Sequence, residues 1–316
     1  AQAVALAIGF PVMIKAAAGG GGRGIRVAHD REEFERLMPQ AAAEAQAAFG
    51  DGGLYLEKVI ARARHIEVQV LGDGTRAIHC GERECSLQRR RQKVWEEAPS
   101  AALPGELRER LCASAVALAQ AVGYRGAGTV EYLFDDATGH FHFIEMNTRI
   151  QVEHPVTEMV TGIDLVREMI RIAGGEALRL RQEDLRPRGH AIEVRLNAED
   201  PAQDFRPGPG TVSRLVLPGG PGVRFDTMLY EGYAVPPFYD SLLGKLIVWD
   251  EDRPAAIARL RRALSELVVE GVPTTRALHL ALAEDPEVLA GAVHTRWLEP
   301  WLAANGGRLA AQGGRG

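Results

Sequence analysis

The stretch TVEYLFDDATGHFHFIE at residues 129–145 decides the fold. Its two ends, residues 129–134 and 141–145, are rich in apolar and aromatic side chains, and they flank the polar segment DDATGH. Two such runs separated by a short polar turn predict a β-hairpin, here with its centre near Thr138. Two neighbouring antiparallel strands are therefore expected in this part of the chain.

Two glutamates are expected to face each other in this hairpin. Pairing that is symmetric about Thr138 places Leu133 opposite Phe143 and Glu131 opposite Glu145, with the two Cβ atoms of each pair about 5 Å apart. Like charges at that separation are destabilising unless a cation or a proton lies between them. The hairpin therefore favours a metal site over the alternative, which is two unrelated surface glutamates.

The segments around the hairpin predict a fold of the α+β class. The run FPVMIK at 10–15 is typical of a strand, and a glycine-rich turn follows it. Asp30 and Glu33 resemble a capping box at the start of an alanine-rich helix that extends to Phe49. Further strands are expected at 54–60, 65–71, 190–196 and 242–249, further helices at 104–123 and 253–269, and a linker at 181–188.

Composition restricts the class of protein. With 316 residues, 46% hydrophobic and 25% charged, the chain can bury a large core and is expected to divide into two or three units. A net charge of -5 makes nucleic acid a poor default partner despite the three arginines at 89–91. No apolar run reaches the roughly 18 residues of a membrane span. Three cysteines without a C-x-x-C pair favour a reducing compartment, so a cytosolic enzyme is expected.

The segment KAAAGGGGRG at 15–24 predicts a loop that binds phosphate. Consecutive glycines let backbone N–H groups approach phosphate oxygens, and Lys15 adds positive charge. The segment is not a Walker A loop, because no Gly-Lys-Ser/Thr follows it. A flexible loop is the common alternative, but the strand before it and Arg23 and Arg26 after it favour phosphate binding.

Three further segments carry polar chemistry. ERECSLQRRRQKVWEEAP at 82–99 offers Lys93 as the preferred contact for bicarbonate or phosphate, although a solvated charged face is the usual interpretation of such a run. EMNTRIQVEHP at 145–155 presents amide, guanidinium and carboxylate groups in succession, which favours a substrate loop over a polar turn. A weaker signal comes from Glu57 and Lys58, which end a strand that could bind an adenine and its ribose.

Four motifs in order carry a family resemblance. They are KAAAGGGGRG at 15–24, ERECSLQRRRQKV at 82–94, FIEMNTRIQVEHPVTE at 143–158 and GHAIEVRLNAEDP at 189–201. Together they strongly resemble the biotin carboxylase component of biotin-dependent carboxylases, to about Trp301. This resemblance implies an ATP-grasp fold followed by a biotin carboxylase C-terminal domain, with the nucleotide between a lid and a floor. The implied parts are a mobile lid at 1–60, a floor at 61–180, a C-terminal domain at 181–302 and a flexible tail at 303–316.

The resemblance also implies a reaction and residues for it. Bicarbonate attacks the γ-phosphate of ATP to give carboxyphosphate, whose carboxyl group passes to the ureido nitrogen of biotin. Glu153 would be the general base on bicarbonate, and Arg195 would stabilise the biotin enolate. The bicarbonate contacts would be Lys93, Arg149, Gln151 and the Val152 backbone. The ATP contacts would be Lys15, Gly21, Gly22, Glu57, Lys58, Ile60, His65 and Gln88. The ligands of Mg²⁺ or Mn²⁺ would be Glu131, Glu145 and Asn147.

The implied partners are a biotin carboxyl carrier domain or protein, a carboxyltransferase subunit and further copies of the chain in a homo-oligomer. Two departures stand out. Arg91 stands where many family members carry a histidine, so a charge is fixed there at all working pH values. The family has an N-terminal α/β domain ahead of the lid, and we expect that domain, with an ATP-binding lysine, to be missing. The alternatives are another carboxyphosphate-forming ATP-grasp ligase, such as the carbamoyl-phosphate synthetase type, and a nucleotide-binding fragment without turnover.

Overall fold

The computed structural model describes residues 2–18 and 25–313. The chain divides into two units, Ala1–Ala61 and Arg62–Gly316. In the first unit, α1 and α2 pack against a three-stranded antiparallel sheet of order β2-β1-β3. The bounds are α1 Gln2–Ile8, β1 Val12–Ala16, β2 Arg26–Ala28, α2 Arg31–Phe49 and β3 Leu54–Lys58.

The predicted capping box at the start of α2 is confirmed. The Asp30 carboxylate accepts a hydrogen bond from the Glu33 backbone N–H at 2.9 Å. Glu33 in turn accepts one from the backbone N–H of His29, also at 2.9 Å. The helix ends at Gly50, which adopts φ 74°, a left-handed conformation that suits glycine.

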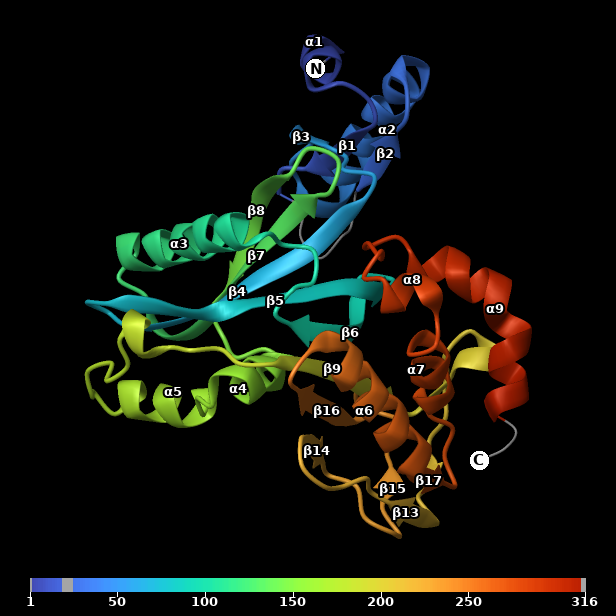
Figure 1. Ribbon diagram of the computed structural model, residues 1–316. Helices are drawn as coiled ribbons and strands as arrows, with labels where there is room; N and C mark the ends of the chain where they lie inside the picture. The colour runs from blue at the N-terminus through green and yellow to red at the C-terminus, as the bar shows by residue number, and fades with distance from the viewer. Residues whose placement is uncertain (1, 19–24, 314–316) are drawn as a thin grey trace. The chain divides into compact units, whose positions relative to one another are not determined.

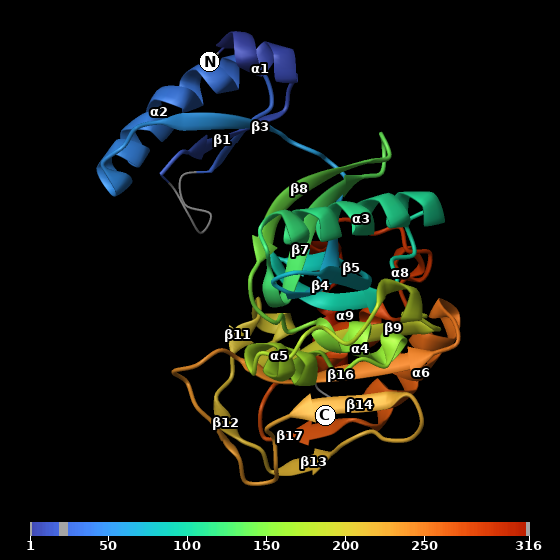
Figure 2. The same cartoon turned by 90° about the vertical axis from the view of Figure 1, so that its left-hand side faces the viewer.

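The second unit is built on one antiparallel sheet of eight strands, in the order β14-β16-β9-β6-β5-β4-β7-β8 (Figure 1). Helix α3 covers one face of its β4 and β7 strands, and α5 covers the other face (Figure 2). Farther along the sheet, α4 and α6 lie on opposite faces of β9 and β16. The strands are β4 Ala63–Asp73, β5 Ala77–Arg89, β6 Gln92–Ala98, β7 Arg125–Asp135, β8 His140–Asn147, β9 His190–Asn197, β14 Val223–Thr227 and β16 Leu242–Asp250; the helices are α3 Gly105–Ala121, α4 His154–Thr161, α5 Leu165–Ala173 and α6 Arg253–Glu266.

Side chains alternate between the two faces of β9, as strand geometry requires. Ile192 and Val194 belong to the core under α6, whereas Ala191 belongs to the core under α4. Glu193 and Arg195 therefore share the face of Ala191. This alternation matters for the site, because it brings charged side chains of β9 to the same face as the start of α4.

Shorter elements complete the second unit. Strand β17 pairs with β13, so the helix expected to reach residue 269 is wrong at its end: α6 stops at Glu266. The remaining elements are the 3-10 turns Gln182–Asp184 and Pro201–Gln203, β10 Glu199–Asp200, β11 Arg206–Pro207, β12 Gly210–Thr211, β13 Arg214–Val216, β15 Ala234–Val235, β17 Val268–Glu270, α7 Arg276–Leu282, α8 Pro286–Leu289 and α9 Leu298–Gly313.

The hairpin of β7 and β8 agrees only in part with the predicted register. Glu131 does pair with Glu145, as predicted. Leu133, however, pairs with His142 and not with Phe143, because the register shifts by one residue between Glu131 and Tyr132. A β-bulge of this kind inserts one extra residue into one strand, which a symmetric pairing scheme leaves out.

Two other expectations about organisation meet a different structure. Residues from 303 onward were expected to form a flexible tail, but α9 continues to Gly313 and buries Leu309 in the core under α6. The sheet also extends across the expected boundary at residue 181, since β9, β14 and β16 lie in the same sheet as the five strands from β4 through β8. Among the described residues, none of the helices combines the length and apolar character needed to cross a membrane.

Candidate active site

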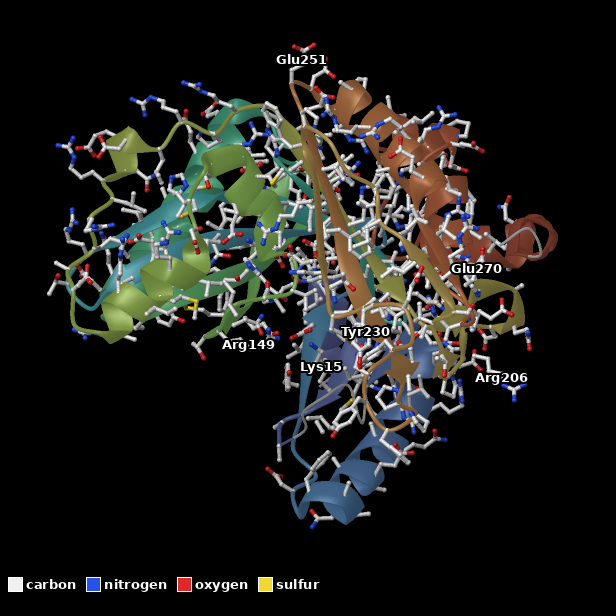
Figure 3. The ribbon with its side chains drawn as sticks, turned by 90° about the horizontal axis from the view of Figure 1, so that it is seen from below. Lys15, Arg149, Arg206, Tyr230, Glu251 and Glu270 are labelled. Atoms are coloured by element: carbon white, nitrogen blue, oxygen red, sulfur yellow. The ribbon has the colours of Figure 1, made fainter. Side chains whose placement is uncertain are left out.

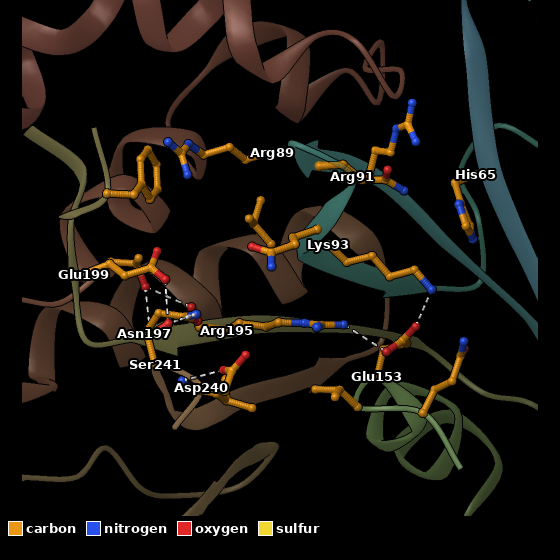
Figure 4. A pocket seen from close by; sticks show the side chains of 18 of the residues that line it. His65, Arg89, Arg91, Lys93, Glu153, Arg195, Asn197, Glu199, Asp240 and Ser241 are labelled. Carbon is orange, nitrogen blue, oxygen red and sulfur yellow. Dashed lines mark hydrogen bonds and ion pairs between the residues drawn. The ribbon is translucent and has the colours of Figure 1, made fainter. Parts of the chain in front are cut away.

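A cavity of about 830 Å³ lies in the second unit (Figure 4). Its walls come from strands β4 to β9, from the loop between β8 and α4, and from the start of β16 and part of α7. Eleven of the predicted site residues line it, although they come from segments far apart in the sequence. They are His65, Gln88, Lys93, Glu131, Glu145, Asn147, Arg149, Gln151, Val152, Glu153 and Arg195.

Lys93 is the cation that joins the acids of this cavity. Its Nζ lies 2.6 Å from Glu67, 3.2 Å from Glu131 and 2.5 Å from Glu153. Burial alone would lower the pKa of Lys93, but these carboxylates raise the pKa above its ordinary value. The ammonium group therefore stays charged throughout the working pH range and can attract an anion.

Glu153 lies immediately before α4 and is only 2% exposed. One of its oxygens contacts Lys93, and the other accepts a hydrogen bond from Arg195 Nη2 at 2.9 Å. Arg195 is fixed from its other side, because its Nε donates to Glu96 at 2.6 Å. The acid predicted to be the base is thus held between two cations (Figure 4).

The predicted metal ligands gather around the hairpin. Glu131 and Glu145 are partners across β7 and β8, and the Asn147 amide lies 3.4 Å from Glu145. Burial favours a higher pKa for Glu131, but contact with His65 and the charge of Lys93 lower its pKa to about 2. Glu131 is therefore ionised. Carboxylate and amide oxygens suit a hard divalent cation, so these residues fit Mg²⁺ or Mn²⁺.

The other predicted residues of the cavity have defined partners. Gln151 donates to Glu131 at 2.9 Å, and Gln88 donates to the Cys85 carbonyl at 2.8 Å. The Val152 carbonyl accepts a hydrogen bond from Lys245 at 2.7 Å. Arg149 is exposed at the surface (Figure 3).

The predicted residues of the first unit can be described only within that unit. Lys15 and Glu57 form an ion pair of 2.5 Å between β1 and β3. Lys58 donates instead to the carbonyls of Gly9 and Phe10, at 2.8 and 3.3 Å. Ile60 follows β3. The predicted phosphate contacts Gly21 and Gly22 lie outside the described residues.

Comparison with known proteins decides the family. Residues 1–181 match the family described as "Carbamoyl-phosphate synthase L chain, ATP binding domain", and residues 193–300 match "Biotin carboxylase C-terminal domain". The biotin carboxylase of Nostoc sp. is 57% identical over 92% of this chain and 65% of that protein. The chloroplastic biotin carboxylase of Arabidopsis thaliana is 55% identical over 93% of this chain and 55% of that protein. The chain belongs to the biotin carboxylase family.

A solved biotin carboxylase agrees with this assignment. The biotin carboxylase domain of the Hydrogenobacter thermophilus 2-oxoglutarate carboxylase, a dimer in complex with MgADP, ADP and bicarbonate, superposes with a TM-score of 0.85. It is 50% identical, and the match covers 95% of this chain and 67% of that chain. The present chain spans 65% and 55% of the lengths of the Nostoc and Arabidopsis biotin carboxylases.

Two residues that support this biotin carboxylase site were missed in the sequence. Glu67 is fully buried and contacts Lys93, and Arg83, also fully buried, donates to Glu67 at 2.7 Å. Arg83 also donates to the Thr157 hydroxyl at 2.9 Å, which joins β5 to α4. A signal for Glu67 did exist, because it stands two residues after His65 in a strand and must share its face. Arg83 had no comparable signal, since it sits in a run of charges.

A polar corner of the cavity was also missed. Asn197 donates to the Ser241 hydroxyl at 3.0 Å, and Ser241 donates to Glu199 at 2.5 Å. Arg91 lines the same cavity with a left-handed backbone of φ 67°. The charged segment at 82–99 belongs to the hairpin of β5 and β6, and the turn between these strands carries Arg90 and Arg91.

Proposed function

We propose that this chain carries the biotin-carboxylating site of a biotin-dependent carboxylase, in which MgATP activates bicarbonate for transfer to biotin. The observation that carries the proposal is the contact of Glu153 with both Lys93 and Arg195 in the cavity wall. Lys93 and Arg195 can bind an anion, and both contact Glu153. A bicarbonate bound by these cations would therefore lie beside Glu153, its proposed base. The relative from H. thermophilus was solved with MgADP and bicarbonate, which supports these substrates.

The residues that we assign to the nucleotide occur in each of the two units of the chain. We infer that residues 1–60 form the lid, 61–180 the floor and 181–302 the C-terminal domain. The glycine-rich segment would approach the phosphates with its backbone N–H groups. The residues assigned to ATP are Lys15, Gly21, Gly22, Glu57, Lys58, Ile60, His65 and Gln88.

Glu131, Glu145 and Asn147 would hold the Mg²⁺ or Mn²⁺ ions that accompany ATP. When bound, such a metal neutralises negative charge on the phosphates. His65 supports this arrangement, because its Nε2 lies 3.4 Å from both Glu67 and Glu131. Burial lowers the pKa of His65, whereas contact with Glu131 and Glu67 raises it, with a net increase.

Residues of the chain would then act on bicarbonate. Lys93, Arg149, Gln151 and the backbone of Val152 hold the anion while Glu153 accepts its proton. The freed oxygen bonds to the γ-phosphorus as the bond to ADP breaks, which gives carboxyphosphate. The carboxyl group then passes to the ureido nitrogen of biotin as its bond to the phosphate oxygen breaks, and the released phosphate takes the proton of that nitrogen. Arg195 stabilises the negative charge on the ureido oxygen of the biotin enolate.

The partners follow from this chemistry. Biotin would arrive on a carboxyl carrier domain or protein, and a carboxyltransferase would consume the carboxybiotin. We propose a homo-oligomer, in line with the dimer of the H. thermophilus relative. A cytoplasmic location fits the three cysteines, which are buried and free.

The test measures phosphate release from MgATP by the protein expressed from its complete reading frame. Bicarbonate and biotin are each omitted in turn. We expect release that depends on bicarbonate and rises when biotin is added. Release that ignores bicarbonate would contradict the proposal, and release driven by bicarbonate with ammonia but not biotin would favour a carbamoyl-phosphate type of ligase.

A further inference from the structure

Two buried glutamates face each other beneath the proposed base. Strands β6 and β9 pair so that Glu96 lies opposite Glu193, and both residues are 0% exposed. Side chains directly opposite each other in an antiparallel pair have Cβ atoms about 5 Å apart. Both carboxyl groups lie on the face of the sheet that carries Arg195, outside the set of residues assigned to substrates or metal.

Hydrogen bonding in this pair is incomplete. Glu96 uses one oxygen to accept from Arg195 Nε at 2.6 Å, while its second oxygen has no hydrogen-bond partner in the part of the chain that the structure describes. Glu193 has no hydrogen-bond partner on either oxygen among the described residues. Buried polar groups are nearly always paired, and two ionised carboxylates facing each other away from water are strongly unfavourable. A single proton on Glu193 would make it a hydrogen-bond donor and would leave Glu96, the residue opposite it, as the acceptor.

The cations near the pair are already engaged. Arg195 on β9 bonds to Glu96 and Glu153, and Lys93 on β6 contacts Glu67, Glu131 and Glu153. Lys245 on β16 donates to the Val152 carbonyl. The other titratable groups near the pair are Glu153, just before α4, and Cys85 on β5. Burial raises the pKa of Cys85.

We propose that Glu193 is a neutral carboxylic acid whose O–H donates a hydrogen bond to Glu96, and that this pair positions Arg195 beside Glu153. Burial, with the negative charge of Glu96 added, raises the pKa of Glu193 well above its ordinary value. Burial also raises the pKa of Glu96 to about 7, with Arg195 acting in the opposite direction. Geometry assigns the proton to Glu193, since Glu96 already accepts from a cation.

The consequence for catalysis rests on the proposed function. When Glu153 takes the proton of bicarbonate, it loses the charge that attracts Arg195. Glu96 keeps its hold on Nε, so the guanidinium stays in place for the oxygen of biotin. A second negative charge on Glu193 would compete with Glu153 for the same guanidinium. The neutral form of Glu193 therefore holds Glu96 in place under Arg195 without adding a negative charge.

Infrared spectroscopy tests the proton directly. A protonated carboxyl group has a C=O band that an ionised carboxylate lacks, and the band shifts in D2O. We expect the wild-type protein at neutral pH to show such a band and Glu193→Gln to lose it. Glu97→Gln is the matched control, because the neighbouring Glu97 is ionised and should not contribute to the band. Burial raises the pKa of Glu97, but its contacts with His190 and Arg253 outweigh burial and lower the pKa to about 2. Equal bands in wild type and Glu193→Gln would overturn the proposal.

Turnover tests the positioning role. Glutamine keeps a neutral donor to Glu96, so Glu193→Gln should retain most of the biotin-dependent turnover, whereas Glu193→Leu should lower kcat by about tenfold or more, the scale of a lost hydrogen bond to a charged group. Equal turnover for the two variants would refute positioning. A wild-type protein without biotin-dependent turnover would refute the proposed function instead, and the infrared result would still decide the state of Glu193.

Discussion

Lys93 and Glu153 form an ion pair of 2.5 Å that joins strand β6 to the start of α4. The pair connects two motifs separated by 60 residues, one that carries cations and one that carries the loop after the hairpin. Because Lys93 also contacts Glu67 and Glu131, its single charge stabilises three acids. A site assembled in this way has carboxylates with separate roles, and each role can be tested by replacing one of them.

Glu153→Gln should remove the base without removing the nucleotide site. We expect bicarbonate-dependent ATP cleavage to fall by about 10²- to 10⁴-fold, the usual contribution of a general base. Affinity for ATP, measured by calorimetry, should stay nearly the same, because Glu153 has no assigned contact with the nucleotide. A comparable loss of ATP affinity would count against the role of Glu153. The exposed Glu176, replaced by Gln, serves as control and should behave as wild type.

Glu145→Gln should remove one charge from the metal pair while preserving its shape. We expect ATP turnover to be abolished and the melting temperature to change little, because Glu145 is exposed. Titration of Mg²⁺ against turnover is the measurement. Near-normal Mg²⁺-dependent cleavage in this variant would show that the hairpin does not hold the metal.

Acid should remove stability that Glu97 contributes. Burial opposes ionisation of Glu97, but His190 and Arg253 lower its folded-state pKa to about 2, from an ordinary value of 4.5. A lowered pKa gives stability that is present above about pH 4.5 and is lost as the pH falls toward 2. The difference in unfolding free energy between wild type and Glu97→Gln should therefore shrink over this range. A difference that is constant or grows on acidification would contradict the assignment.

Arg83→Met should destabilise the second unit. Arg83 is fully buried and donates to Glu67, Gln69 and Thr157. Removal of one partner from a buried ion pair leaves an uncompensated charge, so we expect a loss of about 3 kcal/mol in unfolding free energy. Denaturant unfolding measures this loss. Arg181→Met, at an exposed arginine, should leave the transition unchanged, and an equally small effect for Arg83→Met would show that the buried network is dispensable.

The sequence predicts local features better than long-range pairing. The capping box of Asp30 and Glu33 and the pairing of Glu131 with Glu145 depend on residues close in sequence, and both are confirmed. Leu133 was assigned the wrong partner because a bulge shifts the register, and the residues of this hairpin give no sequence signal for the bulge. The helical residues after 303 were missed because they are rich in Gly and Ala, and their order comes from packing of Leu309.

The site shows the same division. Glu131, Glu145 and Glu153 stand in a segment whose polar density is visible in the sequence, and the cavity brings them together with Lys93. Arg83 could not be found in this way, because its partners come from strands and a helix that only the fold brings together. Burial distinguishes a structural arginine from a solvated one, and a linear run of charges does not contain that information.

The origin of the phosphate oxygen tests the central claim most directly. Bicarbonate labelled with ¹⁸O is supplied with MgATP and biotin, and the released phosphate is analysed by mass spectrometry. If bicarbonate attacks the γ-phosphorus with Glu153 as its base, one labelled oxygen must appear in the phosphate, and Glu153→Gln must form labelled phosphate far more slowly. Phosphate released by the wild-type protein without the label would contradict carboxyphosphate formation and, with it, the function proposed for this cavity.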